Sequence, residues 1–225
     1  MKKNTFLPFV VTCCLAAFGS VGRAEPVLDL SSVEAGNAGA LKAAVEAAGG
    51  TVSGEPIVAV EPGPNGKEEK MISFPGPECT IWVPTKNLDK GSAYEVSAQI
   101  SVDVMPWGKA GGVIFGILFD KNGPVLALGA DRWSKADAVW LRTGNALLLR
   151  ADVLTEQFPT VGMWQRVTLG FDGMDWRLAL GSDFEKKGSA VDVQDERKGL
   201  SRNPPYMICF GCFTGRITVP TVTVR

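Results

Sequence analysis

An eleven-residue segment, Tyr94 to Val104, alternates between apolar and polar side chains at every position. Successive side chains of a β-strand point to opposite faces of its sheet, so this period of two predicts a strand with one buried and one polar face. Met105-Pro106 ends the segment, because proline lacks the N–H that a strand ladder needs. A chain built around such a strand needs a second layer to cover the apolar face.

Further apolar segments, separated by turn residues, follow one another along most of the chain. Gly112 to Phe119 is almost entirely apolar, which is typical of a central strand covered on both faces. Turn sequences at 121–124, 143–145 and 172–175 each separate two apolar segments and predict hairpins. The other expected strands are Ile57–Val60, Met71–Phe74, Thr80–Val83, Val125–Leu128, Ala138–Arg142, Ala146–Val153, Arg166–Phe171, Trp176–Leu180, Met207–Cys212 and Arg216–Val224.

One segment has a helical pattern. Ala38 to Ala48 is rich in alanine, and Gly49-Gly50 predicts its end. The charged stretch from Asp183 to Pro205 is typical of a long loop. About a dozen short strands with so little helix predict an all-β protein, either a sandwich or a barrel.

The N-terminus has the layout of a secretory signal peptide. Two lysines precede an apolar run from Phe6 to Phe18, and small residues stand at the positions that a cleavage site after Ala24 requires. The run is shorter than the roughly 20 residues that a membrane-spanning helix needs. We therefore expect residues 1–24 to be a signal peptide, residues 25–225 to form one domain, and the processed protein to be secreted or periplasmic.

Composition excludes several kinds of chemistry. The chain has no histidine, so it cannot build a Ser-His-Asp or Cys-His nucleophile, or a histidine-rich zinc site. Its 23 basic and 24 acidic residues give a net charge of −1, and no basic block stands out. Neither nucleic acid nor an anionic membrane surface is therefore an expected partner.

Three cysteines follow the expected signal peptide: Cys79, Cys209 and Cys212. An odd number allows at most one disulfide within the chain and leaves one thiol over. Cys209-Phe-Gly-Cys212 has the spacing of a redox motif, but it lies in an apolar, strand-like segment. This context favours buried thiols or one structural bridge over redox chemistry.

Two C-terminal segments carry a family likeness. The segment Gly162–Gly173, continued by Trp176–Gly181, has the pattern G-x-W-x-x-V-x-L … D-G … L-x-L-G, and Gly211–Ile217 is followed by Val222 and Val224. Both resemble the hairpin and the closing strand of laminin-G-like domains, which belong to the concanavalin A-like lectin/glucanase superfamily. The resemblance implies an antiparallel jelly-roll sandwich of two sheets, one of them concave. Members of this superfamily often bind or cleave carbohydrate, although fold alone does not fix function.

The function that we expect first is a non-catalytic, lectin-like carbohydrate-binding protein. Tryptophans in loops can stack a sugar ring, while charged groups orient its hydroxyls. Trp107 and Trp133 lie in loop-like segments, and Asp131, Arg132 and Tyr206 are the expected polar and aromatic partners. The remaining tryptophans are in strand patterns and are expected in the core: Trp82, Trp140, Trp164 and Trp176.

A glycoside hydrolase or lyase is the first alternative. It needs two carboxylates roughly 5–10 Å apart across the sugar. The Glu-x-Asp-x-x-Glu pattern of the superfamily's glucanases is missing, and Glu95 and Asp103 lie roughly 26 Å apart on one strand. An acid pair would therefore have to come from separate strands, and we expect no catalytic residue.

A protein-interaction or structural module of the cell envelope is the second alternative. We expect no cofactor. Asp172-Gly173-Met174-Asp175 could contribute oxygens to a calcium site, but a hairpin turn explains this sequence better. The sequence leaves the oligomeric state and the identity of the ligand open.

Overall fold

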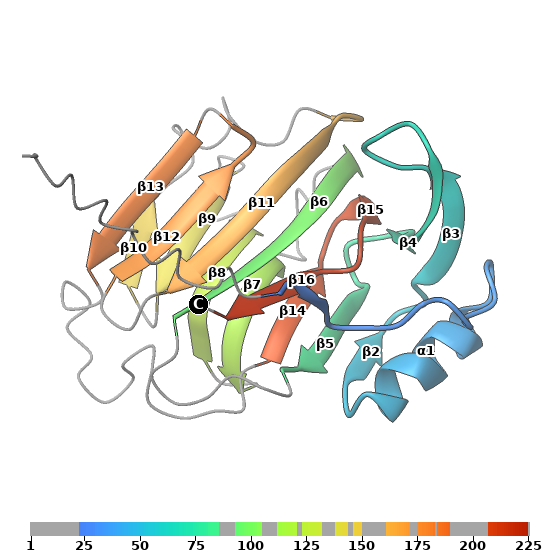
Figure 1. Cartoon of the computed structure of the whole chain (residues 1–225). Coiled ribbons are helices and arrows are strands. Elements are labelled where there is room, and N and C mark those ends of the chain that lie inside the picture. The colour runs from blue at the N-terminus through green and yellow to red at the C-terminus, as the bar shows by residue number, and fades with distance from the viewer. Residues whose placement is uncertain are drawn as a thin grey trace, which may run out of the picture.

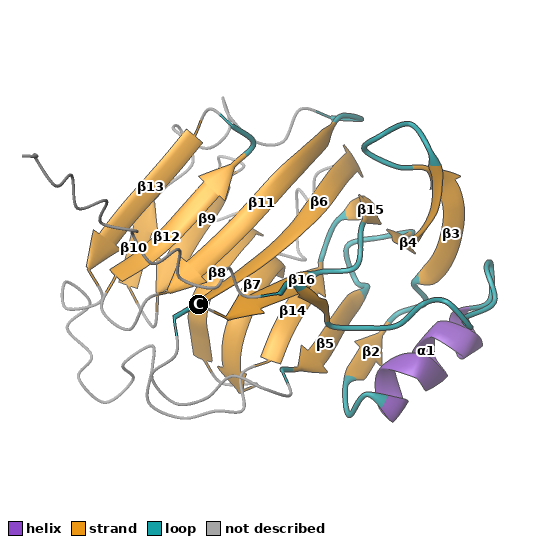
Figure 2. Ribbon diagram, viewed as in Figure 1, coloured by secondary structure: helices purple, strands orange, loops and turns teal. Residues whose placement is uncertain are grey.

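The structure is a computed structural model, and it shows a β-sandwich. Two antiparallel sheets pack face to face, with one helix at one end of the sandwich (Figures 1 and 2). The expected all-β, two-sheet architecture is confirmed. The apolar run of the expected signal peptide lies outside the described residues. The structure describes residues 23–85, 93–104, 112–120, 123–131, 138–143, 146–149, 161–171, 175–182, 184–189 and 207–224.

Strands dominate the described part of the chain, and the helix α1 covers Ala38–Ala47. The strands are β1 (Glu25–Pro26), β2 (Thr51–Ser53), β3 (Ile57–Pro62), β4 (Glu68–Phe74), β5 (Thr80–Pro84), β6 (Tyr94–Val104), β7 (Gly112–Asp120), β8 (Gly123–Asp131), β9 (Ala138–Thr143), β10 (Ala146–Leu149), β11 (Trp164–Phe171), β12 (Asp175–Leu180), β13 (Phe184–Ser189), β14 (Met207–Gly211), β15 (Thr214–Ile217) and β16 (Thr221–Val224).

Within each sheet, strands that are far apart in the sequence lie next to each other. Sheet A has the order β13-β12-β11-β6-β15-β4-β3, while β16 also pairs with β6, and β1 pairs with β16. Sheet B has the order β10-β9-β8-β7-β14-β5-β2. In Figure 1 the strands β13, β12, β11 and β6 lie in front of sheet B. Strand β6 is therefore central to sheet A, with the eight-residue β11 on one side and the four-residue β15 and β16 on the other.

The alternation that predicted β6 determines its two faces. Tyr94, Val96, Ala98, Ile100 and Val102 are each at most 5% exposed and belong to the core between the sheets. The core also contains a cluster of aromatic rings from both sheets. The ring centroid of Phe74 lies 6.2 Å from that of Phe210 and 5.2 Å from that of Phe213.

Strand β7 is buried on both faces, as its continuous apolar sequence predicted. Phe115 and Ile117 face the core between the sheets, whereas Leu118 belongs to a second apolar cluster with Ala127 and Cys209. In that cluster the half-buried Trp82 and Val113 pack against the three buried side chains. The outer face of sheet B is therefore apolar along β5, β14, β7 and β8.

The helix is confirmed, while one loop expectation is wrong. Asn37 caps α1 by accepting a hydrogen bond from Ala40 N, and Leu41 and Val45 are fully buried. The stretch that began at Asp183 was expected to be a loop, but Phe184–Ser189 forms β13 and pairs with β12. Its charged side chains suit an edge strand, because charge on an exposed edge discourages pairing with other chains.

Gly215 allows two strands to approach closely beside a register shift. Its φ is +150°, and a Cβ there would lie 2.2 Å from Ser101 O and 3.0 Å from Val102 Cα. Both contacts involve backbone atoms, which cannot rotate away as a side chain does. Gly66 also has a positive φ, of +71°, but a Cβ there would meet nothing within 4 Å.

We expect a glycine-to-alanine substitution to lower the free energy of unfolding by different amounts at these two positions. Gly215→Ala should lower the free energy of unfolding by about 3 kcal/mol or more, because strain and a backbone clash add. Gly66→Ala should cost only about 1 kcal/mol, because only the left-handed conformation is penalised. Urea unfolding of both variants measures the difference, and equal losses would contradict the close approach at Gly215.

Candidate binding face on sheet A

Most of the loop residues expected to bind sugar are not described by the structure. Trp107, Arg132, Trp133 and Tyr206 lie outside the described residues. Asp131 is the last residue of β8, where its backbone pairs with Ala138 of β9. The loop site therefore stays a prediction.

The described tryptophans have three different environments. Trp176 is 4% exposed in the core, as expected. Trp82 packs against the apolar cluster on the outer face of sheet B. Trp164 was expected in the core, and this prediction is wrong. The side chain of Trp140 lies outside the described residues.

Trp164 is half-buried on the outer face of sheet A. Val167 and Leu169 of β11 are fully buried in the core, so the even-numbered residues of this strand point outward. Trp164 also pairs directly with Ser101 of β6, and directly opposed residues of antiparallel strands share a face. An indole on a polar, outward-facing sheet surface is a platform on which a sugar ring can stack.

A row of side chains continues from Trp164 across the sheet. Ser101 pairs with Trp164 on one side and with Arg216 of β15 on the other, and Arg216 pairs in turn with Ser73 of β4. Ser101 is 1% exposed. Its Oγ and the Nε of Arg216 are buried and have no hydrogen-bond partner among the described residues.

Two carboxylates hold the guanidinium of Arg216. Its Nη1 lies 2.8 Å from Glu61 Oε2, and its Nη2 lies 2.8 Å from Asp103 Oδ1. The hydrogen bond with Glu61 is the largest cause of a raised Arg216 pKa, and the charge of Asp103 also contributes. The hydrogen bonds of this cluster, which joins β3, β15 and β6, are charge-assisted. They fix the positions of its donors and acceptors beside Trp164.

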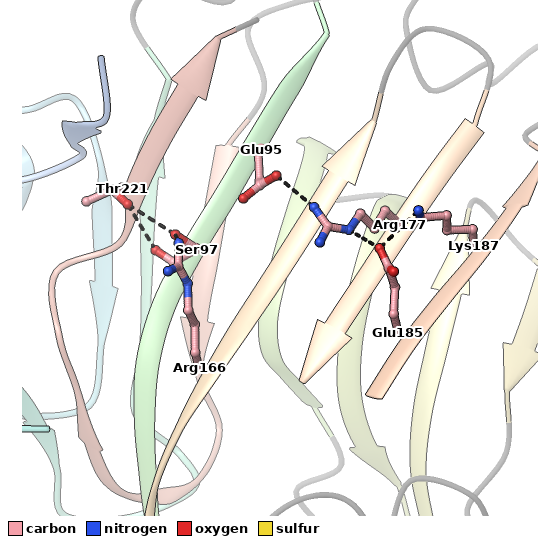
Figure 3. Close-up of polar contacts among 7 residues, drawn as sticks. All are labelled: Glu95, Ser97, Arg166, Arg177, Glu185, Lys187 and Thr221. Atoms are coloured by element: carbon pink, nitrogen blue, oxygen red, sulfur yellow. Dashed lines mark hydrogen bonds and ion pairs between the residues drawn. The ribbon is translucent and has the colours of Figure 1, made fainter. Parts of the chain in front are cut away.

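A second ion-pair network lies toward the other end of β6 (Figure 3). Arg177 Nη1 of β12 is 3.1 Å from Glu95 Oε2, and Arg177 Nε donates to Glu185 of β13. Lys187 Nζ is 3.2 Å from the same carboxylate. Glu95 and Glu185 therefore form a pair of acids from separate strands, which no sequence spacing could reveal.

The chemistry of Glu185 is that of an ionised acceptor. Hydrogen bonds from Lys187, and then from Arg177, lower the pKa of this carboxyl. The general acid of a glycosidase needs the opposite, a pKa raised toward neutrality. Glu185 is thus charged at neutral pH and is suited to accepting hydrogen bonds from ligand hydroxyls.

Small side chains separate the two networks. Thr168 and Gly170 of β11 and Ala179 of β12 share the outer face with Ser97 of β6. Beside them, Arg166 Nη2 donates to Ser97 Oγ at 3.3 Å. The outer face of sheet A thus has ion-pair networks toward both ends, with small side chains and Arg166 between them.

A separate cavity of about 720 Å³ lies where β1 and β16 meet α1. Val27, Leu28, Val222 and the alanines of α1 supply much of its wall. Glu25 and Asp29 also line it, and Asp29 already accepts a hydrogen bond from Ser31 N at 2.8 Å. None of the described residues in its wall is aromatic, so this part of the wall lacks the stacking platform that the face of sheet A provides.

The three cysteines are free thiols. Burial raises the pKa of Cys209 well above its ordinary value and raises that of Cys212 to about 11. A redox or metal-binding cysteine needs a lowered pKa, because the thiolate is the reactive form. The expectation of buried thiols is confirmed for Cys79 and Cys209, while Cys212 is half-buried. The described part of the chain holds no group of His, Cys, Asp and Glu side chains placed to bind a metal ion.

The raised pKa makes Cys212 a slow nucleophile. At pH 8, native Cys212 should hold ~100-fold less thiolate than an ordinary thiol and react correspondingly slowly with iodoacetamide. Peptide mapping by mass spectrometry measures the rate at this residue, with the urea-unfolded chain as the control. Equal rates in the native and unfolded chains would contradict the burial of this thiol.

No described helix has the length and apolar character required to cross a membrane. The hydrophobic residues that are large and exposed include Val161 and Met163, which flank Gly162 just before β11. Gly162 N donates to Val102 O at 2.8 Å, so this turn lies against the end of β6. The segment that carries Trp164 into the sheet is thus anchored through its backbone.

Comparisons with known proteins find matches among solved structures alone. No protein-family model and no curated protein sequence matches the chain. Among solved structures, domain 4 of AbnA, a GH43 extracellular arabinanase from Geobacillus stearothermophilus in complex with arabinotriose, matches with a TM-score of 0.48 and 15% identity, over 78% of this chain and 82% of that one. The globular domain of T. cruzi calreticulin matches with a TM-score of 0.48 and 11% identity, over 78% and 84%.

Ancestral congerin Con-anc matches less closely, with a TM-score of 0.41 and 13% identity, over 64% of this chain and 99% of that one. Likenesses at this level do not transfer a ligand from one chain to another. The function must therefore be argued from the residues of sheet A.

Proposed function

We propose that this protein is a non-catalytic, lectin-like carbohydrate-binding protein, and that the outer face of sheet A is its binding surface. The observation that carries the proposal is the row formed by Trp164, Ser101 and Arg216. It combines a half-buried indole with a guanidinium held by two carboxylates. Sugars present an apolar ring face and a rim of hydroxyls, and this row has a matching group for each.

The proposed mechanism divides recognition between stacking and hydrogen bonding. The sugar ring stacks on Trp164, while its hydroxyls accept hydrogen bonds from Arg216 and donate them to Glu61 or Asp103. Because both carboxylates already hold the guanidinium, little side-chain freedom is lost when the ligand binds. Secretion through removal of residues 1–24 would place such a protein where extracellular glycans are met.

The loop residues are proposed to make a second contribution to glycan binding. Trp107, Asp131, Arg132, Trp133 and Tyr206 remain proposed ligand-binding residues. Stacking on more than one tryptophan would raise the affinity for a glycan of several units.

The first prediction concerns the indole on sheet A. Trp164→Ala should weaken binding to the best ligand of a glycan array at least about tenfold, because the stacking platform is lost. Trp164→Phe should retain part of the affinity, since a smaller ring remains. Met163→Ala is the matched control, because Met163 is 61% exposed, precedes Trp164 and leaves the platform intact.

Comparison with loop variants locates the site. If Trp107→Ala and Trp133→Ala abolish binding while Trp164→Ala binds as well as the parent, the site lies in the loops rather than on sheet A. If the parent binds no glycan of a broad array, the proposed function is wrong, and the envelope interaction module becomes the better interpretation.

A second prediction separates binding from hydrolysis. The acid pair Glu95 and Glu185 is the feature that favours an enzyme, but the lowered pKa of Glu185 opposes it. We expect no release of reducing ends from a broad polysaccharide panel. Release that disappears in both Glu95→Gln and Glu185→Gln would instead establish a glycoside hydrolase with this pair at its centre.

A further inference from the structure

Four cations stand on the outer face of sheet A, and one of them differs from the others. Arg177, Lys187 and Arg216 are each paired with at least one carboxylate. Within the described ranges, Arg166 donates instead to the neutral hydroxyl of Ser97. Its positive charge is therefore not balanced by a described acid.

A chain of hydrogen bonds orients Arg166 (Figure 3). Thr221 Oγ1 donates to Ser97 O at 3.4 Å, so Thr221 Oγ1 can accept from Ser97 Oγ, which lies 3.3 Å away. Ser97 Oγ in turn accepts from Arg166 Nη2 at 3.3 Å. One N–H of the guanidinium is used in this chain, and a guanidinium has five.

Arg166 itself can be reached by a ligand, whereas Thr168 beside it is only 5% exposed. Arg166 is exposed, and the neighbouring positions on the face are the small Thr168, Gly170 and Ala179. Arg166 stands two residues from Trp164 on the same face of β11, which places their Cα atoms about 7 Å apart. A sugar stacked on Trp164 would therefore bring its substituent or its neighbouring unit over Arg166.

We propose that Arg166 binds the carboxylate of an acidic sugar unit, so that the glycan recognised by this face carries a uronic or sialic acid. This inference rests on the proposed carbohydrate-binding function and names its ligand class. The planar fork of a guanidinium matches a carboxylate through two parallel hydrogen bonds. The same face carries four acids: Glu61, Glu95, Asp103 and Glu185. Their negative charge would repel a polymer that carries an acid at every unit. The acidic units are thus expected to be sparse in the glycan.

The test compares an acidic sugar with its neutral counterpart. Calorimetry would measure binding of a glucuronoxylan oligosaccharide, the same oligosaccharide with its carboxyl reduced to the alcohol, and sialyllactose with lactose as its neutral pair. The parent protein should bind one acidic member at least about tenfold more tightly than its neutral pair. The pair that shows the preference identifies the kind of acid.

Variants then assign the preference to Arg166. Arg166→Gln should remove the difference between the acidic and neutral members, because it weakens binding of the acidic member much more than binding of the neutral member. Arg166→Lys should retain part of the difference, because it keeps the charge but not the fork. Lys186→Gln is the matched control, since it removes the same charge from an exposed residue of β13 that pairs with the buried Leu178.

Three results would overturn the inference. Equal affinity of the parent for acidic and neutral members would exclude a carboxylate subsite, while neutral binding that depends on Trp164 would leave the proposed function intact. A preference that survives in Arg166→Gln, or disappears equally in Lys186→Gln, would exclude Arg166 as its source. Failure of every one of these oligosaccharides to bind would reject the inference, whereas the proposed function fails only if the parent also binds no glycan of the broad array.

Discussion

The register of β6 in the middle of sheet A is the constraint on which both the core and the candidate site depend. Its even-numbered residues up to Val102 supply the core, and its odd-numbered residues contribute to each polar group described on the outer face. Because the side-chain period of a strand is two, a slip of one residue would exchange the two sets. The stability of the fold and the proposed recognition of a ligand therefore depend on the same eleven residues.

Ion pairs on the outer face of sheet A fix the positions of its charged groups and determine which protonation state they hold. Arg216 and Arg177 each bridge carboxylates from two other strands, so their positions are fixed by the fold and not by a ligand. The same bonds keep Glu185 ionised, which favours hydrogen bonding over proton donation. Arg166 bonds to a hydroxyl instead, and this contrast gives the face its proposed specificity.

The sequence predicted which segments form strands and helix better than it predicted which residues lie next to each other in the fold. Periodicity and turn residues were sufficient for β6, the doubly buried β7 and the helix, because those signals are local. The pairing of Arg216 with Glu61, 155 residues away, leaves no local signal. The outward direction of Trp164 could have been found, since it is out of phase with Val167 and Leu169. The edge strand β13 was missed because its charged sequence resembles a loop.

The pairing of β1 with β16 has a mechanical consequence. Glu25 lies opposite Val222 and Pro26 opposite Thr221, so the two segments run antiparallel and side by side. A force that pulls Glu25 and Val224 apart would load their hydrogen bonds one after another, as in a zipper, and not all at once in shear. The sandwich would therefore yield first at this seam, at low force, while the long pairing of β6 with β11 still held.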